Sequence, residues 1–133
     1  MDADPRSVIE RLQDTINAHD PVASAGLFAD EARLISARGR ALDLDALQRL
    51  MESSLRSFPD LVVRVVRWIV EGDVVVTEEV LEGTHQGEFA GVAPTGKHVR
   101  LPMVHVARVV DGKIVERTSY QDTAGIMRQL QAT

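Results

Sequence analysis

The stretch HVRLPMVHVARVVDGKIVERTSYQ, residues 98–121, decides the fold. Two runs with many β-branched or aromatic residues, 98–110 and 113–121, flank the pair Asp111-Gly112. β-Branched residues favour strands, and an Asp-Gly pair favours a tight turn between two of them. The sequence therefore predicts an antiparallel hairpin here.

A second hairpin precedes this one in the chain. The runs 61–70 and 74–81 are again rich in β-branched residues, and they flank Gly72-Asp73. Residues 83–97, between the two hairpins, contain four glycines and a proline, which is too many for regular structure. We expect a strand end, a bulge and a loop there, and four consecutive antiparallel strands in all.

Helical patterns lie on both sides of these strands. A first helix is expected over about 5–18, and a second, short helix is expected to end near Asp30. A short strand at 32–37 precedes a third helix, which has Asp43 as its N-cap and an apolar stripe that should face the sheet. The stripe consists of Leu44, Leu47, Leu50, Met51, Leu55 and Phe58. A last helix is expected over about 123–131.

This order of elements predicts the fold class. Strands follow one another instead of alternating with helices, which indicates an α+β fold with helices on one face of the sheet. A chain of 133 residues, 44% hydrophobic and 26% charged, is typical of one globular domain. A curved antiparallel sheet wrapped over N-terminal helices leaves an apolar cavity between the layers, the usual place for a small-molecule ligand.

The composition argues against several classes of function. The chain has no cysteine, which excludes disulfides, thiolate catalysis and cysteine-based metal sites. A net charge of −5, interleaved basic residues and few aromatics argue against nucleic-acid binding. No segment is apolar for long enough to span a bilayer or to form a signal sequence, so we expect a cytoplasmic protein without a membrane partner.

The length of the last turn decides which residues share a face with His105. A three-residue loop pairs His105 with Arg117, whereas a two-residue turn pairs it with Thr118 and brings Asp122 onto its face. We favour the three-residue loop. It places five residues on one face: Met103, His105, Ala107, Arg117 and Ser119.

Several segments together resemble the SnoaL-like polyketide cyclase family. The loop 83–97, the hairpin that ends in Tyr-Gln-Asp at 120–122, and Met-Arg-Gln-Leu at 127–130 carry the resemblance. The start of the chain is similar too, in Asn-Ala-His-Asp at 17–20 and Leu-Phe-Ala-Asp at 27–30. The resemblance covers almost the whole chain. It implies a single domain with the cone-shaped α+β barrel of nuclear-transport-factor-like proteins, a homodimer, an apolar pocket, and no metal or organic cofactor.

The same resemblance implies a reaction and a site. In the family's cyclases, an aspartate on the last strand removes an α-proton, and a histidine on the neighbouring strand holds the developing enolate. The histidine falls on His105, but the aspartate falls on Ser119 and a nearby glutamine falls on Met103. A serine hydroxyl is no general base at neutral pH and methionine donates no hydrogen bond, so the cyclase mechanism does not transfer unchanged.

Three polar residues near the end of the chain are candidates for the site, each with a structural alternative. His105 could act as an acid or base near neutral pH, or be a core histidine bonded to the backbone. Asp122 could be the missing general base, or the N-cap of the last helix. If Arg117 points inward, it needs a carboxylate partner or an anionic ligand.

Further residues are candidates for lining the pocket. Trp68 and Phe28 are apolar, and His85 lies either at the pocket mouth or in a bulge. The acidic residues Glu78, Glu79 and Glu82 are interpreted as a solvated face, because no histidine or aspartate nearby completes a metal site.

Two functional hypotheses follow. The first is a SnoaL-like enzyme that acts by cofactor-free acid/base catalysis on a hydrophobic carbonyl or polycyclic compound, as a cyclase, isomerase or lyase. The second is a non-catalytic module of the same fold that binds a small molecule or dimerises. The strand that contains Trp68 is apolar on both faces, which predicts a partner subunit, most simply in a homodimer.

Overall fold

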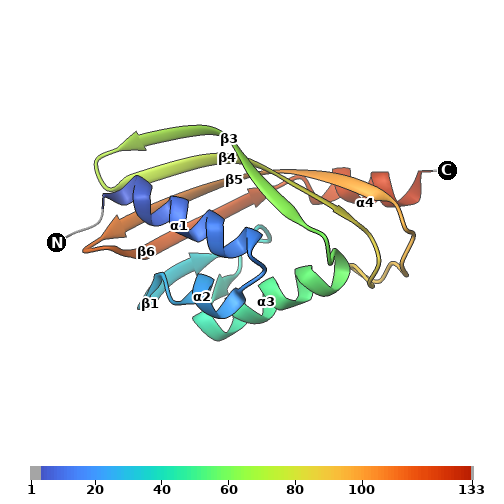
Figure 1. The fold of residues 1–133 in the computed structure, drawn as a ribbon, viewed down its shortest axis with the longest axis horizontal. Helices are drawn as coiled ribbons and strands as arrows, with labels where there is room; N and C mark the ends of the chain where they lie inside the picture. Colours follow the sequence, from blue (N-terminus) through green and yellow to red (C-terminus); the bar gives the residue numbers. More distant parts are fainter. Residues whose placement is uncertain (1–3, 133) are drawn as a thin grey trace.

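A computed structural model describes residues 4–132 of the chain (Figure 1). The elements in chain order are α1 (Pro5–Asn17), α2 (Pro21–Ala25), β1 (Phe28–Ile35), β2 (Ala41–Leu42), α3 (Leu44–Ser57), β3 (Val62–Glu71), β4 (Val74–Thr84), β5 (His98–Val110), β6 (Lys113–Gln121) and α4 (Thr123–Gln131). Within the described residues, no helix is both long enough and apolar enough to cross a membrane.

The strands form one sheet in the order β2-β1-β6-β5-β4-β3. β3 to β6 are consecutive and antiparallel, as predicted, and β1 joins β6 as the single parallel pair of the described sheet. The helices α1, α2 and α3 lie on one side of the curved sheet, and α4 lies at its far end (Figure 1). The α+β class with helices over one face of the sheet is therefore confirmed.

Two apolar clusters attach the helices to the sheet. The first contains Val8 and Leu12 of α1 together with Val109 and Ile114 of the last hairpin, all buried. The second lies at the opposite end and includes Ile126 of α4 with residues of β3 and β5. Neither cluster completely fills the space between α3 and the sheet. The cavity described below lies in this space.

Aspartates begin the described helices. Asp43 accepts a hydrogen bond from the Ala46 amide at 2.7 Å, which confirms its predicted role as the N-cap of α3. Asp4 and Asp20 cap α1 and α2 in the same way. Each side-chain oxygen satisfies an amide that would otherwise have no partner in the first turn.

The second helix and the first strand differ from the prediction. The helix ends at Ala25 instead of near Asp30, and the strand begins at Phe28 instead of residue 32. The Ile114 amide donates to the Leu27 carbonyl at 3.0 Å, and Phe28 pairs with Ile114. Pairing with β6 therefore overrides the local helical pattern of this segment.

The last hairpin contains a two-residue turn followed by a bulge. Asp111 and Gly112 both have positive φ, at 52° and 75°, and Val110 pairs with Lys113. This is the primed turn that an Asp-Gly pair favours. The register then shifts by one residue, because β6 contains an extra residue between the partners of Arg108 and Val109.

Because of this bulge, the observed register differs from both predicted registers. His105 pairs with Ser119, so the predicted pairings with Arg117 and Thr118 are wrong. The predicted shared face is nevertheless right, because one inserted residue restores the alternation that a three-residue loop would have produced. Four members of that face, Met103, His105, Arg117 and Ser119, line the cavity.

Candidate active site

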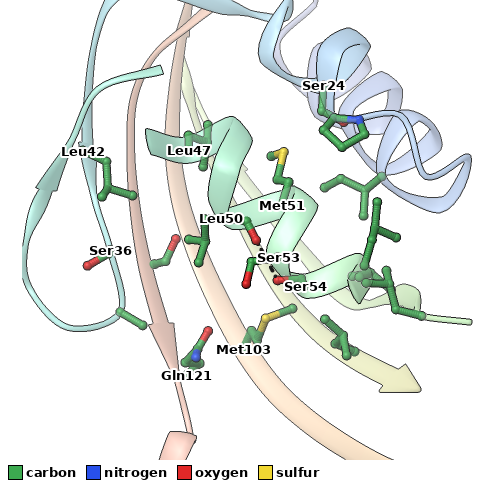
Figure 2. A pocket seen from close by; sticks show the side chains of 18 of the residues that line it. Ser24, Ser36, Leu42, Leu47, Leu50, Met51, Ser53, Ser54, Met103 and Gln121 are labelled. Carbon is green, nitrogen blue, oxygen red and sulfur yellow. Dashed lines mark hydrogen bonds between the residues drawn. The ribbon is translucent and has the colours of Figure 1, made fainter. Parts of the chain in front are cut away.

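A cavity of about 740 Å³ lies between α3 and the concave face of the sheet. Leu50 and Ser53 of α3 lie on one side of it, and Met103 and Gln121 of the sheet lie on the other (Figure 2). Its lining is mostly apolar, and its size suits a ligand with several rings.

One group of polar side chains interrupts the apolar lining. His105 Nδ1 lies 2.9 Å from Ser119 Oγ, within hydrogen-bond distance. On the other side of the ring, His105 Nε2 lies 3.6 Å from Glu79 Oε1, which is an electrostatic contact longer than a hydrogen bond. Arg117 lines the cavity beside them. We call these four residues, Glu79, His105, Arg117 and Ser119, the polar floor.

β-Strand alternation brings the polar floor together. His105 and Ser119 are directly paired across β5 and β6, and Thr77 of β4 pairs with His105 on its other side. Glu79 lies two residues after Thr77, so its side chain points to the same face. Three neighbouring strands therefore each contribute a polar side chain to one place.

Glu79 is the most enclosed member of the polar floor, with 1% of its surface exposed. Its Oε2 accepts hydrogen bonds from Thr77 Oγ1 at 2.5 Å and from Gln13 Nε2 of α1 at 3.1 Å. Burial raises the pKa of the Glu79 carboxyl, while the charge of Arg117 and the two hydrogen bonds act in the opposite direction. These bonds fix the carboxyl in place beside His105.

The imidazole of His105 is held neutral by its surroundings. Burial lowers its pKa well below the usual 6.5, and the nearby positive charge of Arg117 lowers it further. A neutral imidazole carries one proton and one free lone pair. If the proton faces the Glu79 carboxylate, the lone pair at Nδ1 accepts the hydroxyl proton of Ser119.

Arg117 is a buried cation whose donors border the cavity. Its exposed fraction is 8%, and burial lowers its pKa, an effect that the charge of Glu79 partly offsets. Within residues 4–132 its side chain makes no hydrogen bond or ion pair. Its nitrogens are not among the buried polar atoms that lack both a partner and accessible surface, so they can be reached from the cavity. A guanidinium has five donors, so these remain available to a ligand.

Phe28 and Trp68, both predicted to line the pocket, lie outside the cavity. Phe28 is 3% exposed and belongs to the first apolar cluster. Trp68 packs against that cluster, with the guanidinium carbon of Arg6 4.5 Å from the centre of its ring. Neither residue is among those that line the cavity.

His85 is also absent from the cavity lining and fastens the loop that follows β4. Its ring Nδ1 lies 3.0 Å from Thr95 Oγ1, and its ring centre is 5.7 Å from that of Phe58. The side chain is fully buried. Its surroundings are those of a residue that holds the loop, not of one at a pocket mouth.

Asp122 forms the N-cap of α4 and does not line the cavity. Its Oδ1 accepts a hydrogen bond from the Gly125 amide at 2.8 Å, and about half of its side chain is exposed. The observed register also keeps it off the His105 face. We therefore do not include Asp122 in the polar floor.

The carboxylate nearest His105 is Glu79, which sequence reasoning placed on a solvated face. That interpretation was wrong for Glu79, although its neighbours Glu78 and Glu82 do form partly exposed ion pairs with arginines. The signal was present in the sequence, because adjacent residues of a strand point to opposite faces. Glu78 and Glu79 could not both face solvent.

The described residues contain no group of three or more histidine, aspartate or glutamate side chains positioned to hold a metal ion. The polar floor itself offers one carboxylate and one imidazole beside a permanent cation. This set suits proton transfer and oxyanion binding more than metal coordination.

Comparison with known proteins assigns the chain to a family. The family model described as SnoaL-like polyketide cyclase matches residues 6–130. The chain belongs to this family. A solved structure from Jannaschia sp. CCS1 with the same family description has this fold, with a TM-score of 0.87 over 97% of this chain.

Curated relatives match over shorter stretches. The nogalonic acid methyl ester cyclase of Streptomyces nogalater is 41% identical over 51 residues, or 38% of each chain. The aklanonic acid methyl ester cyclase AcmA of Streptomyces galilaeus is 41% identical over 58 residues, which is 44% of this chain and 40% of the relative. The matched part thus spans about two fifths of the length of these relatives.

Solved structures match over nearly the full length. AclR of Streptomyces galilaeus, for which a hydroxylase role has been suggested, has a TM-score of 0.89 and 28% identity over 97% of this chain and 82% of its own. IdmH of Streptomyces antibioticus, for which a polyketide cyclase role has been suggested, has a TM-score of 0.87 and 29% identity over 96% of this chain and 99% of its own.

Proposed function

We propose that this protein is a cofactor-free enzyme of the cyclase or isomerase type, which enolises a hydrophobic carbonyl compound inside the cavity. One observation carries the proposal: His105 Nδ1 and Ser119 Oγ lie 2.9 Å apart at the wall of an apolar cavity. The names of the curated relatives, both methyl ester cyclases, support a cyclase role.

The proton transfer that we propose begins at a C–H bond beside the substrate carbonyl. Ser119 Oγ accepts this proton while its own hydroxyl proton moves to Nδ1 of neutral His105. The electron pair of the C–H bond passes to the carbonyl oxygen, which becomes an enolate. Ser119 is thus a relay, and His105 is the final proton acceptor.

The other two members of the polar floor stabilise the charges that form. Arg117 donates hydrogen bonds to the enolate oxygen, and because it is buried it does so with little competition from water. Glu79, held by Thr77 and Gln13, stabilises the positive imidazole from the Nε2 side. In an aldol closure the enolate carbon then attacks a second carbonyl of the same molecule, and the proton returns to the alkoxide.

Exchange of α-hydrogen for deuterium tests the relay without a known substrate. Incubated with 2-tetralone in deuterated buffer, the wild-type protein should accelerate loss of the α-proton NMR signal above the buffer rate. Ser119→Ala should lower this acceleration about 100-fold, because the relay hydroxyl is gone. Ser53→Ala, which alters a hydroxyl elsewhere in the cavity lining, should exchange like the wild type. Equal rates for Ser119→Ala and the wild type would contradict the relay.

We also propose that the outer face of the sheet forms a homodimer interface. Ile69, Val106 and Tyr120 are 54%, 36% and 58% exposed, and they lie on three strands of the same sheet. Exposed apolar side chains gathered on one face are typical of subunit contacts. Sedimentation should find a dimer, and Val106→Glu should shift it to a monomer, whereas Val22→Glu on α2 should not. A wild-type monomer at all concentrations would contradict this interface.

A further inference from the structure

Four exposed arginines are among the residues that line the cavity. Arg38 and Arg40 lie on the turn between β1 and β2, and Arg49 and Arg56 lie on α3. All four line the cavity and are exposed, so they stand where the cavity opens to solvent. We call them the rim arginines.

Within the described part of the chain the rim arginines have no acidic partner, whereas several arginines on the outer face of the sheet do. On the outer face of the sheet, Arg64 lies 3.5 Å from Glu82 and Arg67 lies 3.3 Å from Glu78. Among residues 4–132, no carboxylate lies within ion-pair distance of a rim arginine, although Asp45 and Glu52 also lie on α3.

The two acidic residues of the cavity lining do not neutralise the rim arginines. Asp20 is the acidic lining residue near the surface, and its Oδ1 accepts a hydrogen bond from the Ala23 amide as the cap of α2. Glu79 is deep in the floor, beside Arg117. Four cations against one engaged carboxylate is an unusual balance at one opening of a chain whose net charge is −5.

We propose that the substrate carries a carboxylate, which the rim arginines hold at the cavity mouth while its apolar ring system lies inside. This inference rests on the proposed function and narrows its substrate class. Apolar side chains of α3 such as Leu47 and Met51 also line the cavity, so an amphiphilic acid would find apolar surroundings for its rings and cations for its carboxylate. Arginine suits the acid end because its planar fork binds a carboxylate through two parallel hydrogen bonds.

This substrate class differs from the compounds in the names of the curated relatives. Those names specify methyl esters, in which the carboxyl group carries no charge. Positive charges at the rim attract a carboxylate more strongly than an uncharged ester. The rim arginines therefore predict that this protein prefers the free acid to its methyl ester.

Calorimetric titration of the wild-type protein with a matched pair of compounds tests this preference. The probes are anthraquinone-2-carboxylate and its uncharged methyl ester, each measured in low and high sodium chloride. At low salt the acid should bind about tenfold more tightly than the ester, and high salt should remove most of the difference because it screens exposed charges. Equal affinity of acid and ester at low salt would overturn the proposal.

Two double variants show which arginines cause the preference for the acid. Arg49→Gln/Arg56→Gln should reduce the preference for the acid to less than about threefold, because it removes two rim cations from an exposed helix face. Arg11→Gln/Arg33→Gln changes the net charge equally at exposed positions outside the cavity and should keep the preference. An undiminished preference in the rim variant, or the same loss in the control, would place the acid elsewhere and overturn the proposal.

The exchange assay separates this inference from the proposed function. 2-Tetralone has no charge, so its exchange in the wild-type protein tests the polar floor independently of the acid-binding rim. If acid and ester bind equally while exchange continues, the inference fails and the proposed function stands. If the wild type binds the acid preferentially but accelerates no exchange, the proposed function fails and the binding site remains.

Discussion

Replacement of His105 with asparagine is expected to lower the enzyme-catalysed exchange rate of 2-tetralone by about 10² to 10⁴-fold, the usual contribution of a positioned acid or base. Asparagine can still form a hydrogen bond with Ser119, but it cannot accept a proton at neutral pH. The loss should therefore fall on the rate constant, while the affinity for an apolar ligand changes little.

His98→Asn is the matched control for this prediction. His98 lies at the start of the same strand β5, with 60% of its side chain exposed, and it does not line the cavity. Its variant should exchange at the wild-type rate. A His105→Asn variant that keeps its thermal transition and still exchanges within about threefold of the wild type would remove His105 from the mechanism.

Replacement of Glu79 with leucine is expected to lower the free energy of unfolding by about 2–5 kcal/mol, because two buried hydrogen-bond donors lose their acceptor, at roughly 1–3 kcal/mol each. The change leaves the cation of Arg117 uncompensated, and it leaves donors of Gln13 and Thr77 without their acceptor. Urea titration measures the loss. Glu78→Leu on the same strand should cost less than about 1 kcal/mol, because Glu78 forms only a surface ion pair with Arg67.

A double variant distinguishes lost charge compensation from lost packing. Arg117→Met should also destabilise the protein, because Glu79 then loses the cation that favours its charged form. The double variant Glu79→Leu/Arg117→Met should lose at least about 1 kcal/mol less than the sum of the two single losses. Simple additivity would show that the two side chains are not coupled.

The sequence predicted the large elements well because their signals are local. The hairpin at 98–121 and the helix after it were placed correctly, since alternation and an Asp-Gly pair define a strand and its turn without reference to the rest of the chain. The segment at Phe28 was misassigned for the opposite reason. Its helical pattern competes with pairing to Ile114, a partner far away in the chain that no local pattern reveals.

The site was predicted only in part. His105 and Ser119 were placed on the correct face, but their pairing depends on a one-residue bulge in β6 that has no distinct sequence signal. Glu79 was missed because neighbouring glutamates suggested a solvated face, whereas the alternation of β4 required one of them to point inward. The rim arginines come from a turn and a helix that are brought together only by the fold.

The pH dependence of the exchange rate tests the central claim, that neutral His105 accepts the proton. The base must be unprotonated. Burial, and to a smaller extent the positive charge of Arg117, keeps the pKa of His105 well below 6.5. After subtraction of the buffer rate, the catalysed rate should therefore stay constant as the pH falls from about 8 through 6.5, and decline only below that value. A midpoint at or above 6.5, or the same profile in His105→Asn, would contradict the account.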